Sequence, residues 1–205
     1  MSRAETGNLR LGSNVVELLM PQKRPFLMVD FVHAFHSAPI ASIEAGRHIS
    51  SNETFFDGHF PGMHVWPGTL TIEGMGQTSA LLMTILAMRR ASEASGADPD
   101  AVLARLRNLD LGFRLHPGHK PDDAADLIRR IRSEPPWLAI GASVDVKLLR
   151  PVFAGQRLDY VTTLAGEVGS MMRFQVEALV ERVPVASGTL TGARLSRPLA
   201  LAPPP

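Results

Sequence analysis

One stretch of the sequence, Thr69 to Met88, restricts the possible folds more than any other. Its apolar side chains fall on almost every side of a helical wheel, which is typical of a helix buried all round. The Pro67–Gly68 pair stops the preceding chain and Thr69 can cap the first turn, so we expect a helix to begin there. The rest of the protein must then be built around this helix.

Strands are predicted on both sides of the helix. Two precede it, and four follow it in the last third of the chain. Because short turns such as Gly169–Ser170 join consecutive strands, we expect an antiparallel sheet. The sequence therefore predicts an α+β hotdog fold, in which a curled antiparallel β-sheet surrounds a long central α-helix. The predicted strands are Phe26–His33, Ile40–Ile49, Leu138–Leu149, Arg157–Glu167, Met171–Arg182 and Val185–Leu195.

The chain is expected to form one domain with loose ends. Its 205 residues, 45% of them hydrophobic and 20% charged, suffice for a single core. Residues 1–14 are polar and the chain ends in LAPPP, so both ends are expected to be loose. The predicted parts are an N-terminal extension (1–17), a single hotdog domain (18–195) and a flexible tail (196–205).

An insertion is predicted directly after the central helix, over about residues 91–136. The residues that follow Arg90 are small and polar, which indicates a loop or linker. Two short helices are expected within it, at Val102–Arg107 and at Asp122–Arg132. An addition at this place can cover a tunnel beside the helix or extend an interface between subunits.

Composition argues against several classes of protein. With 21 basic and 20 acidic residues the net charge is +1, which gives no support for a nucleic-acid-binding protein. The absence of cysteine excludes disulfides, thiolate metal sites and a cysteine nucleophile. The N-terminus has no apolar signal core, and Glu73 and Gln77 interrupt the longest apolar stretch, which argues against a membrane span. A cytoplasmic protein is expected.

Two ionisable side chains beside the helix are candidates for acid–base chemistry. His59 lies in a Gly- and Pro-rich loop, and histidine is the side chain best suited to exchange protons near pH 7. Glu73 lies near the start of the apolar helix, where a carboxyl partly removed from water can serve as a general acid. Gly68 offers an N–H at the helix start, and Gln77 lies one turn beyond Glu73. From the residues alone, purely structural roles for these groups stay open.

Residues 58–77, GHFPGMHVWPGTLTIEGMGQ, resemble the signature of the 3-hydroxyacyl-[acyl-carrier-protein] dehydratases of fatty acid synthesis. That family carries a GHFPG loop, a proline–glycine pair and then a helix with a carboxylate and a glutamine. His59 and Glu73 are 73 − 59 = 14 positions apart, which is the family spacing. The similarity covers about residues 18–90 and 138–195. Three further segments agree with it: RPFLMVD (24–30), NETFFD (52–57) and KLLRPVFAGQRL (147–158).

The resemblance implies an enzyme that removes water from 3-hydroxyacyl thioesters, with His59 as the base and Glu73 as the acid. The working unit would be a homodimer, or a higher oligomer, in which each site takes its histidine and its carboxylate from different subunits. The acyl chain would be carried on the phosphopantetheine of an acyl carrier protein or on coenzyme A, with no metal or other cofactor. The carbonyl of Val65 would orient His59, and the N–H of Gly68 would polarise the thioester carbonyl. The residues implied to contact substrate are Phe60, Val65, Trp66, Gly68 and Gln77.

Three alternatives to the dehydratase stay open. A hotdog acyl thioesterase would use a carboxylate on the central helix without a GHFPG histidine, so His59 argues against it. A catalytically silent scaffold or binding protein would keep the fold and use the insertion as its contact surface. A metal site is the third, but the histidine spacings fit no well-known ligand set. The histidines concerned are His48, His59, His64, His116 and His119.

The chain departs from the family pattern at several places. Trp66 is bulkier than the residue common there, and Gly74 and Gly76 replace alanines. These changes are expected to reshape the acyl tunnel. Together with the predicted insertion at 91–136, they favour a specialised pathway, such as polyketide or unusual-lipid synthesis, over housekeeping fatty acid synthesis.

Overall fold

The structure is a computed structural model that describes residues 7–116, 118–119 and 139–194. Within these ranges the chain forms one seven-stranded sheet, three α-helices and a short 3-10 helix. The elements are β1 (Gly7–Leu11), α1 (Ser13–Leu19), β2 (Phe31–His36), β3 (Ser42–His48), η1 (Thr54–Asp57), α2 (Gly68–Ala94), α3 (Ala101–Leu115), β4 (Ala139–Leu148), β5 (Arg157–Val168), β6 (Met171–Val180) and β7 (Val183–Arg194).

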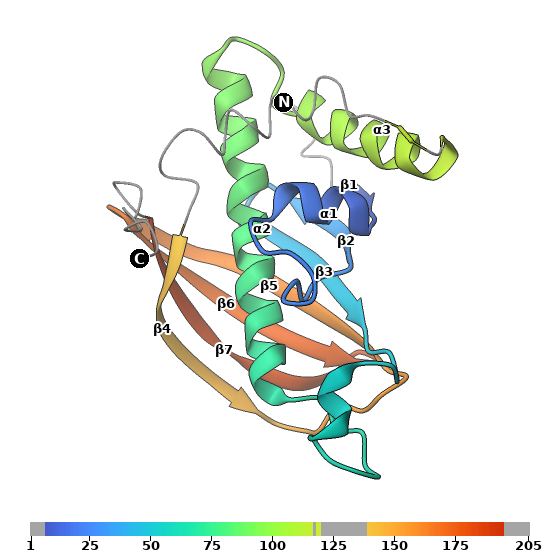
Figure 1. The fold of residues 1–205 in the computed structure, drawn as a ribbon. Coiled ribbons are helices and arrows are strands. Elements are labelled where there is room, and N and C mark those ends of the chain that lie inside the picture. Colours follow the sequence, from blue (N-terminus) through green and yellow to red (C-terminus); the bar gives the residue numbers. More distant parts are fainter. Residues whose placement is uncertain (1–6, 117, 120–138, 195–205) are drawn as a thin grey trace, which may run out of the picture.

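The strands are arranged in the order β1-β2-β3-β5-β6-β7-β4, and every neighbouring pair is antiparallel. Helix α2 packs against β3, β4, β5 and β6. Figure 1 shows strands β4 to β7 passing along one side of α2, while α1 and α3 lie near β1 and β2. The predicted arrangement of an antiparallel sheet around a long central helix is confirmed. No helix in the described ranges is long and apolar enough to cross a bilayer.

The four strands predicted in the last third of the chain are confirmed within a few residues. Along β6 the alternation is the one read from the sequence, with one face of the strand in the core. The hairpin at Gly169–Ser170 is also present, and Gly169 has the positive φ of 58° that favours glycine there. The buried side chains of β6 are Met172, Phe174, Val176, Ala178 and Val180.

The strand predicted at Phe26–His33 is only partly correct, because β2 begins at Phe31. The N–H groups of Phe26 and Leu27 donate to the carbonyl of Lys23, so the chain turns here. Leu27, Met28 and Val29 are nevertheless fully buried. They enter the core as a loop segment, and their apolar character reflects burial and not strand pairing.

The expectation that residues 1–14 are loose is wrong for residues 7–14. Strand β1 pairs with β2, and its side chains alternate between the core and the solvent. Leu9 and Leu11 are buried, while Asn8 and Arg10 point outward and give the segment its polar character. Residues 7–11 of the predicted N-terminal extension therefore form one edge of the sheet, and helix α1 begins at Ser13.

Both helices around Arg90 are longer than predicted. Helix α2 ends at Ala94 and not at Met88, and α3 replaces the short helix expected at Val102–Arg107. One face of α3 is buried, and the helix packs against β1 and α1. The carboxylate of Asp110 accepts hydrogen bonds from the Gly12 N–H and the Arg114 Nε, both at 2.6 Å. The predicted helix at 122–132 and tail at 196–205 lie outside the described residues.

Gly74 of α2 lies against a fully buried tyrosine, Tyr160 of β5. An added Cβ at Gly74 would come 2.2 Å from the Tyr160 Oη and 2.3 Å from its Cζ. Burial also raises the pKa of the Tyr160 hydroxyl well above its usual value. Glycine at this position therefore lets the helix and the sheet approach closely.

We expect Gly74→Ala to lower the free energy of unfolding by about 1–3 kcal/mol, because the ring has no room to move aside. Urea unfolding measures the change. Gly166→Ala is the matched control, since an added Cβ there meets nothing within 4 Å. If the two variants are equally stable, the close packing of Tyr160 on α2 is refuted.

Candidate active site

His59 lies in the loop between η1 and α2 and is half-buried. Its Nδ1 is 2.9 Å from the carbonyl oxygen of Val65, which is the contact expected at that position. Because a carbonyl only accepts hydrogen bonds, the Nδ1 donates, and Nε2 of the neutral ring is left as an acceptor. The loop therefore presents a histidine in the tautomer required of a base.

Backbone contacts and a buried tryptophan hold the His59 loop in place. The Trp66 N–H donates to the Val152 carbonyl at 2.8 Å. The indole is only 2% exposed, meets Phe55 edge-on, and has the Arg47 guanidinium 5.1 Å above its ring. Trp66 also lines the pocket of His59.

Phe60 and Gly68 complete the surroundings of His59 in different ways. The Phe60 ring stacks on the imidazole with centroids 4.2 Å apart, and the side chain remains 47% exposed. Gly68 is the first residue of α2, so its N–H precedes the first hydrogen bonds of the helix. An added Cβ at Gly68 would lie 2.4 Å from Leu148 Cδ1, so β4 closes over the helix start. His59, Val65, Trp66 and Gly68 line one pocket.

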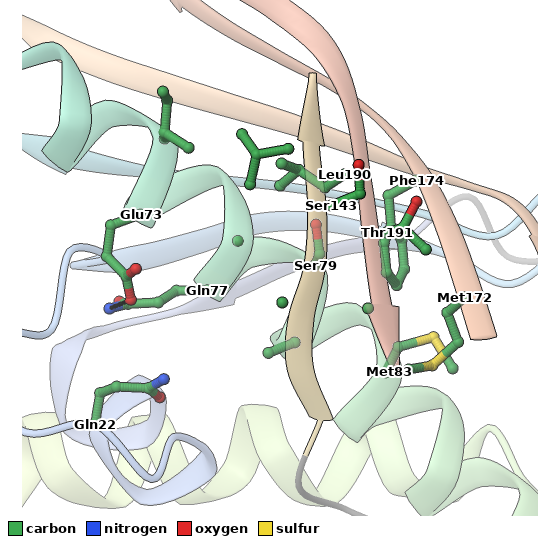
Figure 2. A pocket seen from close by; sticks show the side chains of 16 residues that line it. Gln22, Glu73, Gln77, Ser79, Met83, Ser143, Met172, Phe174, Leu190 and Thr191 are labelled. Atoms are coloured by element: carbon green, nitrogen blue, oxygen red, sulfur yellow. Dashed lines mark hydrogen bonds between the residues drawn. The ribbon is translucent and has the colours of Figure 1, made fainter. Parts of the chain in front are cut away.

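Glu73 is held by Gln77, one turn further along α2. The Gln77 Nε2 donates to Glu73 Oε1 and to the Phe26 carbonyl, both at 2.8 Å. Its Oε1 accepts the Met28 N–H at 2.7 Å. Gln77 is buried, and both its amide nitrogen and its amide oxygen make hydrogen bonds. It therefore fixes the carboxylate of Glu73 relative to the loop that contains Phe26 and Met28. The pair lines a cavity of about 250 Å³ between α2 and strands β4, β6 and β7. Figure 2 shows both side chains at the end of this cavity away from Met83 and Met172.

The structure does not bring His59 and Glu73 together within one chain. His59 shares its pocket with Gly68, whereas Glu73 lines the second cavity together with Gln77. Both pockets border the same strand, β4, at different points along its length. The site residues predicted from the sequence thus lie at two separate pockets, which we call the two half-sites.

Two features of the Glu73 cavity were not predicted from the sequence. The first is Gln22, which lines the cavity and whose buried Oε1 has no partner among the described residues. Figure 2 shows this side chain on the same side of the cavity as Glu73 and Gln77. The second is a half-buried stripe of α2 that faces the cavity, so the helix is not buried all round. The stripe consists of Ile72, Glu73, Gly76, Ala80 and Met83.

Besides His59, three of the histidines considered for a metal site lie against aromatic rings. His48 contacts Phe31, His119 contacts Phe113, and His64 stacks on the nearby Phe56. Within the described ranges, no group of three or more His, Cys, Asp or Glu side chains is arranged to hold a metal ion.

Comparison with known proteins assigns the chain to a family. A model described as the FabA-like domain matches residues 20–106. The 3-hydroxyacyl-[acyl-carrier-protein] dehydratase FabZ of Campylobacter fetus subsp. fetus is 32% identical over 142 residues, which cover 66% of this chain and 90% of the relative. The chain belongs to this FabZ dehydratase family. With the FabZ of Polynucleobacter necessarius subsp. necessarius it is 46% identical over 69 residues, and the match spans only 45% of that relative's length.

A solved structure extends the likeness to the whole fold. The dehydratase heterocomplex ApeI:P from Xenorhabdus doucetiae superimposes with a TM-score of 0.52, covering 89% of this chain and 91% of that one. At 12% sequence identity this likeness concerns the fold alone, and it confirms the hotdog fold of the FabZ family member. The FabA-like match at 20–106 contains both half-sites, from His59 to Gln77.

Proposed function

We propose that this FabZ family member removes water from 3-hydroxyacyl thioesters to give trans-2-enoyl thioesters, with His59 as the base and Glu73 as the acid. One observation carries the proposal: the two half-sites border the same exposed edge strand. Two copies of the chain paired along β4 would complete two sites, each with His59 from one copy and Glu73 from the other.

The position of β4 supports this pairing. It is the last strand of the sheet, so one of its edges pairs with no strand in the described part of the chain. Val144 lines the Glu73 cavity and Leu148 lines the His59 pocket, and these side chains are 58% and 54% exposed. Four residues of strand separate them, about 13 Å. Antiparallel pairing of two β4 strands centred on Val146 would set Leu148 of one copy beside Val144 of the other.

Each group of the completed site has one chemical task. The Nε2 of His59 takes the proton from C2 of the substrate, while its Nδ1–H stays on the Val65 carbonyl. The Gly68 N–H and the positive end of α2 stabilise the negative charge that develops on the thioester oxygen. The Glu73 carboxyl donates its proton to the 3-hydroxyl group, which leaves as water. Gln77 holds that carboxyl in place throughout.

The substrate would arrive as a thioester on the phosphopantetheine of an acyl carrier protein, the carrier in the names of the relatives, or on coenzyme A. Arg150 lines the His59 pocket and is a candidate contact for the phosphate of the arm or for an acidic carrier. The chemistry uses only side chains and a backbone amide, so the proposal includes no metal or other cofactor. It places the protein in the cytoplasm, in fatty acid or polyketide-type biosynthesis.

Mass spectrometry of 3-hydroxyacyl thioesters tests the proposal directly. Thioesters on carrier protein and on coenzyme A are incubated with the wild-type protein and with His59→Ala. We expect loss of one water with the wild type and none with the variant. Release of free thiol would indicate a thioesterase instead, and recovery of unchanged thioester at all chain lengths would favour a binding protein.

A further inference from the structure

Gly76 is a glycine inside a helix, and packing against the residues that the structure describes gives no reason for it. Two other glycines of α2 have close neighbours, since an added Cβ would strike Leu148 at Gly68 and Tyr160 at Gly74. At Gly76 an added Cβ meets no atom of residues 7–116, 118–119 or 139–194 within 4 Å. Glycine weakens a helix relative to alanine, because it loses more backbone freedom on folding. Glycine at position 76 therefore leaves a space open beside the helix, at a cost in helix stability.

The open space at Gly76 is part of the cavity that contains Glu73. Gly76 follows Glu73 by three residues, so the two positions lie on the same face of α2. Gly141 on the β4 side of the cavity is likewise a position where an added Cβ meets nothing within 4 Å. The absence of a side chain at Gly76 therefore widens the cavity one turn from the carboxylate, whereas Gly141, which pairs with Gly192 next to Met172, lies toward the other end.

The length of the cavity is limited at its other end. Figure 2 shows Met83 and Met172 together at the end away from Glu73. Met83 follows Glu73 by ten residues, about 15 Å along the helix axis. A chain that enters past Glu73 thus gains width at Gly76 before it meets the methionines.

We infer that Gly76 is a specificity-determining residue, which makes room for a branch on the acyl chain beside the 3-hydroxyl group. The inference rests on the proposed function, in which Glu73 contacts that hydroxyl. The chain beyond C3 then continues along α2 toward Met83, and its C4 passes Gly76, one turn after Glu73. The substrate class is a 3-hydroxyacyl thioester with a methyl substituent on C4. An alanine at position 76 would place its own methyl group in the space of that substituent.

The experiment compares two coenzyme A thioesters, 3-hydroxyhexanoyl and 3-hydroxy-4-methylhexanoyl, which differ by one methyl group. The kcat/KM for enoyl product is measured with the wild type and with Gly76→Ala. We expect the ratio of branched to straight-chain kcat/KM to fall about 10-fold or more in the variant, the usual effect of one misplaced methyl in an apolar pocket. Gly166→Ala, which adds the same methyl outside the cavity, is the control and leaves the ratio unchanged.

Two further measurements show whether an altered ratio of kcat/KM values comes from the cavity, from the stability of the fold or from self-association. Gly76→Ala is expected to melt at or above the wild-type temperature, because alanine favours the helix and meets no neighbour. Light scattering is expected to show unchanged self-association. Weaker self-association of the variant, or an unchanged ratio of branched to straight-chain kcat/KM, would overturn this inference and leave the proposed function standing. Water loss by the wild type from neither acyl chain, whether on coenzyme A or on carrier protein, would refute the proposed function and the inference with it.

Discussion

Alanine at either His59 or Glu73 is expected to lower kcat/KM for water loss by about 100- to 10,000-fold, the range by which a positioned acid or base accelerates a reaction. The two changes remove different proton transfers, so each alone disables a site. Both side chains are only half-buried, so both variants are expected to fold. Turnover assays with circular dichroism as the folding control measure both effects.

Mixing the two inactive variants is expected to restore activity. A dimer with one copy of each has one site with both wild-type groups and one site with neither. Random exchange of subunits makes half of the dimers mixed, so about a quarter of the wild-type sites return in a two-fold dimer. Native mass spectrometry of differently tagged subunits confirms that exchange has occurred. Full exchange without activity would contradict the shared site and with it the role of β4.

The half-site of His59 was largely predictable from the sequence, because its contacts are local. His59, Val65 and Gly68 lie within ten residues, in a loop that glycines and prolines restrict, and the expected carbonyl contact to His59 is present. The cavity of Glu73 was not predictable in the same way. Its other members come from distant elements, such as Gln22 before β2 and Met172 in β6. No local pattern indicates that these side chains meet.

The fold shows the same division between local and distant causes. The strands of the last third were predicted because alternation along a half-buried strand is a local signal. The segment Leu27–Val29 was wrongly predicted as strand, because its backbone is held by Gln77, 49 residues away from Met28. Strand β1 and the full length of α3 were missed, because β1 is stabilised by its pairing with β2, and α3 by its packing on β1 and α1. Tertiary contacts override local preference in such segments.

Removal of the Glu53 carboxylate is expected to lower the free energy of unfolding by about 3 kcal/mol, because it leaves a buried arginine without its closest counter-charge. Arg47 is 5% exposed, and its Nη2 donates to Glu53 Oε1 at 2.5 Å. Its Nη1 donates to the Leu27 carbonyl at 2.8 Å, while Asp30 is 4.0 Å away. Breaking such a pair costs more than the pair contributes, since the remaining charge stays out of water.

The consequence of Glu53→Ala for the site follows from the position of Arg47. Its guanidinium lies over Trp66, the residue after Val65, whose carbonyl orients His59. Urea unfolding of Glu53→Ala is compared with Asp159→Ala, which breaks the more exposed Arg157–Asp159 pair and is expected to cost at most about 1 kcal/mol. Equal stability of the two variants would show that water reaches Arg47. A larger loss for Glu53→Ala, with kcat lowered as well, would show that this buried charge pair helps to hold the base in position.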